Sequence, residues 1–395
     1  MKKFIPFVII VILFSLISCI GPKTVTKNVR NGTYKQKELS FRENFTSPDL
    51  QRFSIAIIPD SQGYAHFSAQ DWIDSNLKYG YIFARQTQFI ADHSVKNGGD
   101  FSCAIHVGDL VHEKSNMKSE WLIADSCMSN LIDQLPLLIV PGNHDYDKWV
   151  KDNNIDGSTT YNSYFGPESK YFKNKEWYGG SSAEGRNSWI TFKACGYDFL
   201  VLGLEINPSK ESLEWAQNVI DNHKGWPTIY VTHENIGLLY RNAGEPLMNA
   251  PYLSVSSREI FNHTSPEEVF KQFISKNNQI FMTICGHISA DDCGSSLRID
   301  KNNYNNTVYS ILSDYQNTRS YLARNAYEPY FLQFCGDGWM TILDFDLDEN
   351  EIHVHTYSTE FDEFRTDNYA ELTLPIDWAW NERFYKEASD ITDAK

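Results

Sequence analysis

The sequence predicts an α/β fold, and three observations support this prediction. Short apolar runs rich in β-branched residues, a pattern typical of buried strands, recur along the chain. Segments with the length and pattern of helices lie between several of them. The chain has 395 residues, 42% of them hydrophobic, so it can bury a large core within one domain of about 300 residues.

Taken in order along the chain, five apolar runs are predicted to be buried strands: Phe53 to Ile58, Ala104 to Val107, Leu137 to Val140, Ile229 to Val231 and Ile280 to Ile284. We predict helices over about 77 to 97, near 118 to 134 and over Ser209 to His223, and another strand over Phe199 to Leu204. Two long loops, 146 to 187 and 235 to 262, leave the third and fourth runs. Because long loops in compact domains are usually functional, we expect the first to form a substrate-pocket wall or a structural cap.

A short polar motif follows each of the five runs: Pro59-Asp60-Ser61-Gln62, Gly108-Asp109, Gly142-Asn143-His144-Asp145, Thr232-His233 and Gly286-His287. In an open α/β sheet, ligands bind beyond the carboxyl ends of the strands, so these segments are expected to converge. One motif alone indicates little, since Gly-Asp is usually a turn and a single His is usually structural. The ordered set of five predicts a two-metal phosphoesterase site.

The residue types suit metal-assisted hydrolysis. A bridging carboxylate such as Asp109 can hold two cations about 3.5–4 Å apart, which lets one bind the attacking water while both clamp a phosphoryl group. Imidazole and carboxylate together favour first-row metals, whereas a site made only of oxygen atoms would favour Mg or Ca. A metal also lowers the pKa of bound water toward about 7, so hydroxide forms without a Ser, Cys or Thr nucleophile.

These motifs resemble those of the calcineurin-like metallophosphoesterases, whose pattern is D-x-H, G-D, G-N-H-[DE], H and G-H-x-H in that order. The resemblance spans roughly residues 53 to 358. It implies a four-layer fold, a two-sheet β-sandwich flanked by helices. We expect four later strands to pair antiparallel and to complete the second sheet: Ser296 to Asp300, Thr307 to Leu312, Trp339 to Asp346 and Glu351 to Ser358.

The resemblance also implies a phosphoester substrate, phosphomonoester or phosphodiester, and two divalent or trivalent first-row metal ions, Mn, Fe or Zn. Asp60 and Gln62 would bind the first metal, and Asp109 would bridge both. The second metal would be held by three residues, Asn143, His233 and His287. His144 would stabilise or protonate the leaving-group oxygen, and Asp145 would orient it.

Two positions depart from the family pattern, and both concern the first metal. Gln62 stands where the first motif has His, and it is a neutral and weaker donor than imidazole. Ser289 stands where G-H-x-H has its second His, and a hydroxyl is a poor ligand. The resemblance is to secreted bacterial members with a D-x-Q first motif, because four further segments agree with them: 106 to 112, 177 to 180, 313 to 316 and 336 to 346.

The N-terminus is predicted to be a targeting segment. Lys2 and Lys3 precede an apolar stretch, Phe4 to Ile17, that is too short for an ordinary spanning helix. Leu16-Ile17-Ser18-Cys19 is typical of a lipoprotein cleavage site, so we predict a signal peptide over 1–18 and lipidation of Cys19 in the bacterial cell envelope. A plain secretory signal or an uncleaved anchor is the alternative.

The remaining chain divides into a predicted flexible tether over 19–50, a catalytic domain over 51–360 and a C-terminal tail over 361–395 whose aromatic residues pack on the domain. Six cysteines follow Cys19. Cys103, Cys195 and Cys285 fall on predicted strands and are expected to be apolar core residues, whereas Cys293 and Cys335 are the candidate disulfide.

The formal charge of −16, with no basic cluster in the predicted domain, excludes a stable nucleic-acid partner. Among the other histidines, His106 is predicted to be structural and His353 and His355 to lie on a surface strand, while His112 could reach the pocket. Two alternatives to the dinuclear hydrolase stay open, because both departures weaken the first metal. One is a non-catalytic binding lipoprotein on the same fold, and the other is a mononuclear hydrolase.

Overall fold

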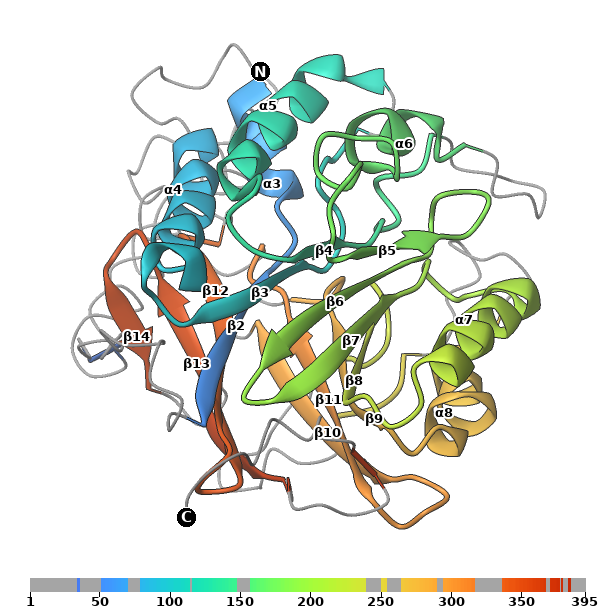
Figure 1. Cartoon of the computed structure of the whole chain (residues 1–395). Helices are drawn as coiled ribbons and strands as arrows, with labels where there is room; N and C mark the ends of the chain where they lie inside the picture. The colour runs from blue at the N-terminus through green and yellow to red at the C-terminus, as the bar shows by residue number, and fades with distance from the viewer. Residues whose placement is uncertain are drawn as a thin grey trace, which may run out of the picture.

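A computed structural model of the chain (Figure 1) describes residues 34–35, 51–69, 79–113, 116–147, 157–238, 250–253, 264–289, 294–316, 336–366, 370–376, 378 and 383–384. The predictions for the signal peptide, for Cys19 and for a disulfide between Cys293 and Cys335 fall outside these residues. Among the described helices, none combines the length and the hydropathy needed to cross a bilayer.

The described strands form two sheets, and the first has the spatial order β1-β14-β13-β12-β2-β3-β4, with β15 also paired to β13. Strands β2, β3 and β4 run parallel to one another, and β12 runs antiparallel to β2. The strand bounds are β1 (Tyr34–Lys35), β2 (Arg52–Ile58), β3 (Phe101–His106), β4 (Leu137–Ile139), β12 (Trp339–Asp346), β13 (Glu351–Ser358), β14 (Glu363–Arg365) and β15 (Glu371–Pro375).

The second sheet has the order β10-β11-β9-β8-β7-β6-β5. Strands β7, β8, β9 and β11 run parallel, so their carboxyl ends lie at one end of the sheet. The strand bounds are β5 (Tyr178–Ser181), β6 (Ser188–Ala194), β7 (Tyr197–Gly203), β8 (Thr228–Val231), β9 (Ile280–Cys285), β10 (Ser295–Lys301) and β11 (Thr307–Ser313).

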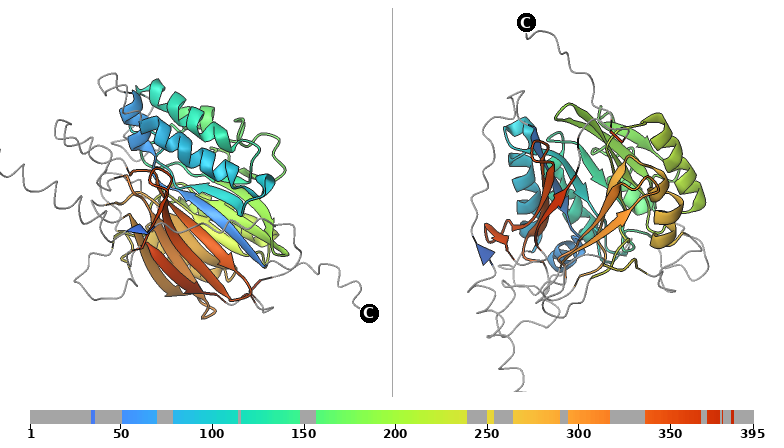
Figure 2. Two further views of the ribbon diagram at one scale, coloured as in Figure 1. Left: turned by 90° about the vertical axis from the view of Figure 1, so that its left-hand side faces the viewer. Right: turned by 90° about the horizontal axis from the view of Figure 1, so that it is seen from below.

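Helices cover the outer face of each sheet, so the fold has four layers, as the right-hand view of Figure 2 shows. On the first sheet, Ala56 and Ala104 pack with Phe83 of α4 and Trp121 of α5. The second sheet packs against α7 and α8. The helix bounds are α3 (Gln62–Ala69), α4 (Tyr79–Asp92), α5 (Lys118–Met128), α6 (Thr159–Phe165), α7 (Lys210–Asn222) and α8 (Pro266–Gln272).

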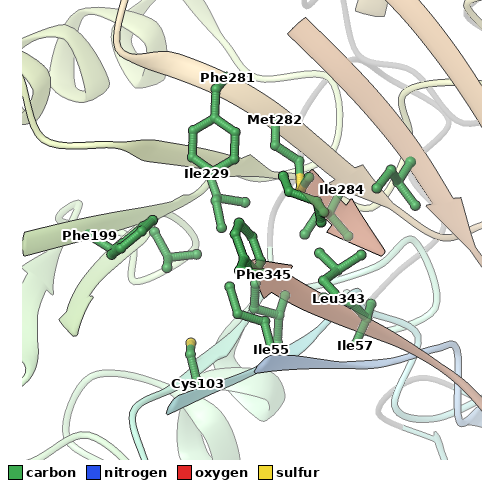
Figure 3. Close-up of a cluster of buried hydrophobic side chains, with 14 of the residues drawn as sticks. Ile55, Ile57, Cys103, Phe199, Ile229, Phe281, Met282, Ile284, Leu343 and Phe345 are labelled. Atoms are coloured by element: carbon green, nitrogen blue, oxygen red, sulfur yellow. The ribbon is translucent and has the colours of Figure 1, made fainter. Parts of the chain in front are cut away.

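The main core lies between the two sheets (Figure 3). Ile55 and Ile57 alternate with residues that face the helices, as the period of two along a strand requires. Phe345 stacks on Phe53 with ring centroids 4.4 Å apart, and Phe281 meets the edge of Phe345 from the opposite sheet. This contact pattern confirms the predicted two-sheet sandwich.

Several details differ from the predictions. Strands β12 and β13 do not complete the second sheet but join the first, because β12 pairs with β2 from Thr341 to Asp346 and with β13 on its other side. The segment predicted as the loop 146 to 187 contains α6 and β5. Strand β6 and helix α8 were not predicted, although the capping box of Ser265 and Glu268 marks the start of α8.

The described part of the C-terminal segment adds to both the first sheet and the core. Strands β14 and β15 pair with β13, and the buried Trp378 and Phe384 pack between the sheets. Cys103 and Cys285 are buried on strands as expected, whereas Cys195 lies in the turn between β6 and β7 with φ 54°. The buried Cys103, Cys127 and Cys285 are free thiols.

Candidate metal centre

The carboxyl ends of the parallel strands from both sheets meet at one place. The Nδ1–H of His233, which follows β8, donates to the carbonyl oxygen of Val107, which follows β3, at 2.7 Å. The backbone amide of His287, after β9, donates to the carboxylate of Asp60, after β2, at 3.2 Å. The predicted convergence of the motifs is therefore present, and it joins two sheets rather than one.

Acceptor atoms gather around Nε2 of His233. Asp109 Oδ2 lies 3.3 Å from it, Asn143 Oδ1 3.1 Å and His287 Nδ1 3.2 Å. Because Nδ1 of His233 carries the proton donated to Val107, a neutral ring presents a lone pair at Nε2 to these atoms. The ligand atoms of Asp109, His233 and His287 all lie within 4.8 Å of one another. A cation fits this donor set, since each of these atoms can supply a lone pair to it.

The charges of His233 and Asp109 depend on each other. Burial opposes a charge on His233, but the neighbouring carboxylate of Asp109 outweighs it and raises the pKa of His233 to about 9. Burial likewise opposes ionisation of Asp109, and the charges of His233 and His144 overcome it, so the pKa of Asp109 falls well below its usual range. A metal ion bound here would displace the proton that His233 otherwise attracts.

The backbone around the centre is tightly constrained. A Cβ on Gly142 would lie 2.2 Å from Asp109 Oδ1, and one on Gly286 would lie 2.3 Å from Asp60 Oδ1, so both motif glycines are required for close approach. Asp109 and His287 adopt left-handed conformations with φ 55° and 76°. Such strained conformations in residues other than Gly cluster at functional sites.

Two residues of this centre were not among the predicted ligands. Asp314 and Gln316 follow β11, and the side-chain amide of Gln316 donates to Oδ2 of Asp60 at 3.1 Å and to Oδ2 of Asp314 at 3.2 Å. Burial, together with the charges of Asp314 and Asp109, raises the pKa of Asp60 well above its usual range. Burial also raises the pKa of Asp314. The signal that could have identified Asp314 was a carboxylate two residues beyond the predicted strand Thr307 to Leu312, and directly after β11 as observed.

Gln62 is buried in the centre, but its orientation differs from the expected one. Its Nε2 donates to Asp109 Oδ2 at 3.0 Å, and its Oε1 accepts from Nδ1 of His112 at 2.9 Å. The oxygen predicted to bind the first metal therefore points toward His112. Half a turn of the amide would bring the oxygen to the metal side, and His112 can accommodate it because a neutral imidazole donates or accepts at Nδ1.

His144 lies half-buried beside the carboxylate of Asp109, to which its backbone amide donates at 2.8 Å. Its Nδ1–H donates to the carbonyl oxygen of His112 at 2.7 Å, and the two rings stack with centroids 4.9 Å apart. The carboxylate of Asp145 accepts backbone N–H groups of Leu110 and Gly142, which ties two motif loops together. Its role in orienting His144 stays a prediction. Burial and Asp109 raise the pKa of Asp145 to about 7.

The other histidines largely follow their predictions. His106 is fully buried and structural, and His353 and His355 stand on one face of β13 with rings 6.2 Å apart. His112 reaches the centre through Gln62. His66 was not among the predicted site residues. Its ring lies 4.6 Å from that of His112 at an angle of 53°, and its Nδ1 lies 2.6 Å from the buried Glu120, whose carboxylate also accepts the His112 amide.

Known proteins that are similar to the chain include one sequence relative and one solved structure. No protein-family model matches the chain. The chain is similar to the uncharacterized protein YvnB of Bacillus subtilis (strain 168), with 26% identity over 348 residues. The match covers 84% of this chain but 22% of YvnB, so the chain spans about a fifth of the length of that relative. Among solved structures, a dimetal phosphatase from Danio rerio aligns with a TM-score of 0.42 and 11% identity, over 82% of this chain and 99% of the phosphatase.

Proposed function

We propose that this chain is a metal-dependent phosphoester hydrolase of the calcineurin-like metallophosphoesterase type. One observation supports the proposal above all others. The lone-pair atoms of Asp109, Asn143 and His287 surround Nε2 of the buried His233 within 3.3 Å. Buried acceptors that face one another require a proton or a cation between them, because their mutual repulsion is otherwise unrelieved.

The residues divide between two ions. Asp109 would bridge them; Asn143, His233 and His287 would complete the second, and Asp60 would hold the first. Two first-row ions bound here would polarise the phosphoryl oxygens and supply activated water as the nucleophile. The chain itself holds the carboxylate of Asp109 in place, because the Gln62 side chain and the His144 backbone amide donate to its two oxygens.

His144 is the proposed general acid. The carbonyl oxygen of His112 fixes the proton on Nδ1, so Nε2 is the atom that gives a proton to the leaving oxygen when the ring is charged. Stacking against His112 limits rotation of the ring. The substrate phosphoryl group would therefore lie between the Asp109 centre and Nε2 of His144.

Turnover of model esters tests the proposal. We expect the purified protein, loaded with Mn, Zn or Fe, to hydrolyse p-nitrophenyl phosphate or bis(p-nitrophenyl) phosphate, and a chelator to stop the reaction. Asp109→Asn should abolish turnover. The matched control is Asp198→Asn on β7, which removes a buried carboxylate paired with Lys193 at 3.1 Å, at the strand end remote from the centre. Hydrolysis that persists in chelator would contradict the mechanism.

A mononuclear enzyme is the second candidate, because the oxygen of Gln62 faces His112 and Ser289 replaces an expected His. Metal analysis separates the candidates. Two equivalents per chain with turnover support the dinuclear enzyme, and one equivalent with turnover supports the mononuclear one. One equivalent or none without turnover supports a non-catalytic binding protein.

We further propose that Cys19 carries a lipid that anchors the chain in a bacterial cell envelope, on the basis of the sequence alone. Cys19→Ser should then move the protein from the membrane fraction to the soluble fraction on ultracentrifugation. A wild-type protein that is soluble without detergent would contradict this placement.

A further inference from the structure

Two buried carboxylates share one neutral partner beside the proposed metal centre. Asp60 is 2% exposed and Asp314 is 0% exposed. The side-chain nitrogen of Gln316 lies 3.1 Å from Oδ2 of Asp60 and 3.2 Å from Oδ2 of Asp314, and the Gln316 backbone amide donates to Oδ1 of Asp314. The amide therefore holds the two carboxylates toward the same point.

The sheet topology places Asp314 there. Strand β11 pairs parallel to β9, so its carboxyl end lies next to that of β9. His287 follows β9, and its backbone amide donates to Asp60. Asp314 is the first residue after β11 and thus approaches Asp60 from the second sheet, just as His233 and His287 approach Asp109.

The charges around this pair do not balance. Buried carboxylates are normally paired with cationic side chains or bind metals, because an isolated buried charge is very costly. Within the described residues, the cationic group nearest to Asp60 is His233 at 4.0 Å, and no ion pair with Lys, Arg or His is found for Asp314. Gln316 contributes hydrogen bonds but no charge. Without metal, a proton retained between the two carboxylates supplies the missing positive charge, and a bound cation would take its place.

We infer that Asp314 is a ligand of the first metal ion together with Asp60, and that Gln316 positions both carboxylates. This inference rests on the proposed metal centre. It also accounts for Ser289, since a carboxylate from β11 supplies the donor that the missing imidazole would have given. With Asp60, Asp109 and Asp314 as oxygen donors, the first site is harder than the second, so it favours Mn over Zn.

The test compares the full-length wild type with Asp314→Asn and Asp198→Asn after loading with Mn. Metal content is measured by mass spectrometry and the coupling between ions by electron paramagnetic resonance. We expect two Mn per chain with an exchange-coupled spectrum for the wild type and for Asp198→Asn. Asp314→Asn should bind the first-site ion at least 100-fold more weakly, leaving one Mn and an uncoupled six-line spectrum.

Thermal unfolding in chelator separates a ligand from a structural residue. Asn removes one of two like charges, but its Nδ2 faces the side-chain nitrogen of Gln316, so the unfolding temperature of Asp314→Asn in chelator serves as the metal-free baseline. Added Mn should then stabilise the variant less. If Asp314→Asn yields no folded protein, the affinity of Asp314→Glu for the first ion is measured instead. A ligand moved by one methylene should bind that ion at least fivefold more weakly. Unchanged affinity overturns the inference.

The results also distinguish this inference from the proposed hydrolase. An Asp314→Asn protein that keeps both ions with affinities within twofold of the wild type overturns the inference. Another outcome separates the two. If the wild type binds two ions, Asp314→Asn loses the first-site ion and no phosphoester is hydrolysed, the ligand assignment stands and hydrolysis is refuted.

Discussion

His106 provides the most direct test of how the centre is held together. The ring is fully buried, and its Nδ1 accepts the backbone N–H of Gly108 at 3.1 Å. Because Nδ1 is an acceptor, a neutral ring carries its proton on Nε2 and donates it to the hydroxyl of Ser61 at 3.0 Å. His106 therefore links the loop that contains Asp60 to the loop that contains Asp109.

The pH dependence follows from the pKa of His106. Burial and the neighbouring His233 lower this pKa from 6.5 to about 3. The unfolded chain takes up a proton near pH 6.5 while the folded chain does not, so this group's contribution to stability is present above pH 6.5 and is lost as the pH falls. Between pH 7.5 and pH 5.0 the linkage amounts to about 2 kcal/mol.

We predict that His106→Leu destabilises the protein by about 2 kcal/mol at pH 7.5, because the buried amide of Gly108 loses its partner. At pH 5.0 the difference between the variant and the wild type should shrink by about 2 kcal/mol, since Leu does not titrate. Urea unfolding followed by tryptophan fluorescence at both pH values measures this.

The control for this prediction is Ser61→Ala, which keeps the imidazole. It should cost about 1 kcal/mol at pH 7.5 and retain the pH dependence of the wild type. A His106→Leu variant whose destabilisation is the same at pH 5.0 and pH 7.5 would refute the buried neutral imidazole.

Three further predictions concern the centre itself. His144→Ala should lower kcat by about 10²- to 10⁴-fold on an alkyl phosphate, with unchanged metal content. The loss on p-nitrophenyl phosphate should be much smaller, because that leaving group needs no acid. Equal losses on the two substrates would contradict the role of His144 as general acid. Ser289→His should raise the affinity for the first ion roughly tenfold or more in equilibrium dialysis, because imidazole is the better ligand, and unchanged affinity would place Ser289 away from that ion. At pH 8, above the pKa of about 7 of Asp145, Asp145→Asn should cost about 2 kcal/mol in urea unfolding because two donors then meet at Gly142, and a neutral result would refute that hydrogen bond.

The parts of the centre that could be predicted are those that depend only on residues close together in the sequence. A buried strand followed by Asp, Asn or His identifies a polar side chain at a strand end, and this rule placed Asp60, Asp109, Asn143, His233 and His287 together. The four-layer fold was expected from the resemblance to the metallophosphoesterases, and the apolar pattern agrees with it. Its apolar runs fill the space between two sheets, and the helices between them cover the outer faces.

The parts that escaped prediction depend on contacts between distant segments. Thr307 to Leu312 looked like half of an antiparallel hairpin, and it does pair with β10 in that way. Nothing local shows that its other neighbour is β9, in parallel, so neither Asp314 nor Gln316 was recognised. The orientation of the Gln62 amide likewise depends on His112, which lies 50 residues away in the sequence.

The placement of the centre between two sheets has a mechanical consequence. Asp60 and Asp109 extend from the first sheet, whereas His233, His287 and Asp314 extend from the second. The separation of these donors is set by the packing between the sheets, so rigid strands rather than loops determine the geometry available to an ion. An ion held by donors from both sheets therefore binds most tightly when the sandwich is closed, and by linkage it must stabilise the packing between the sheets.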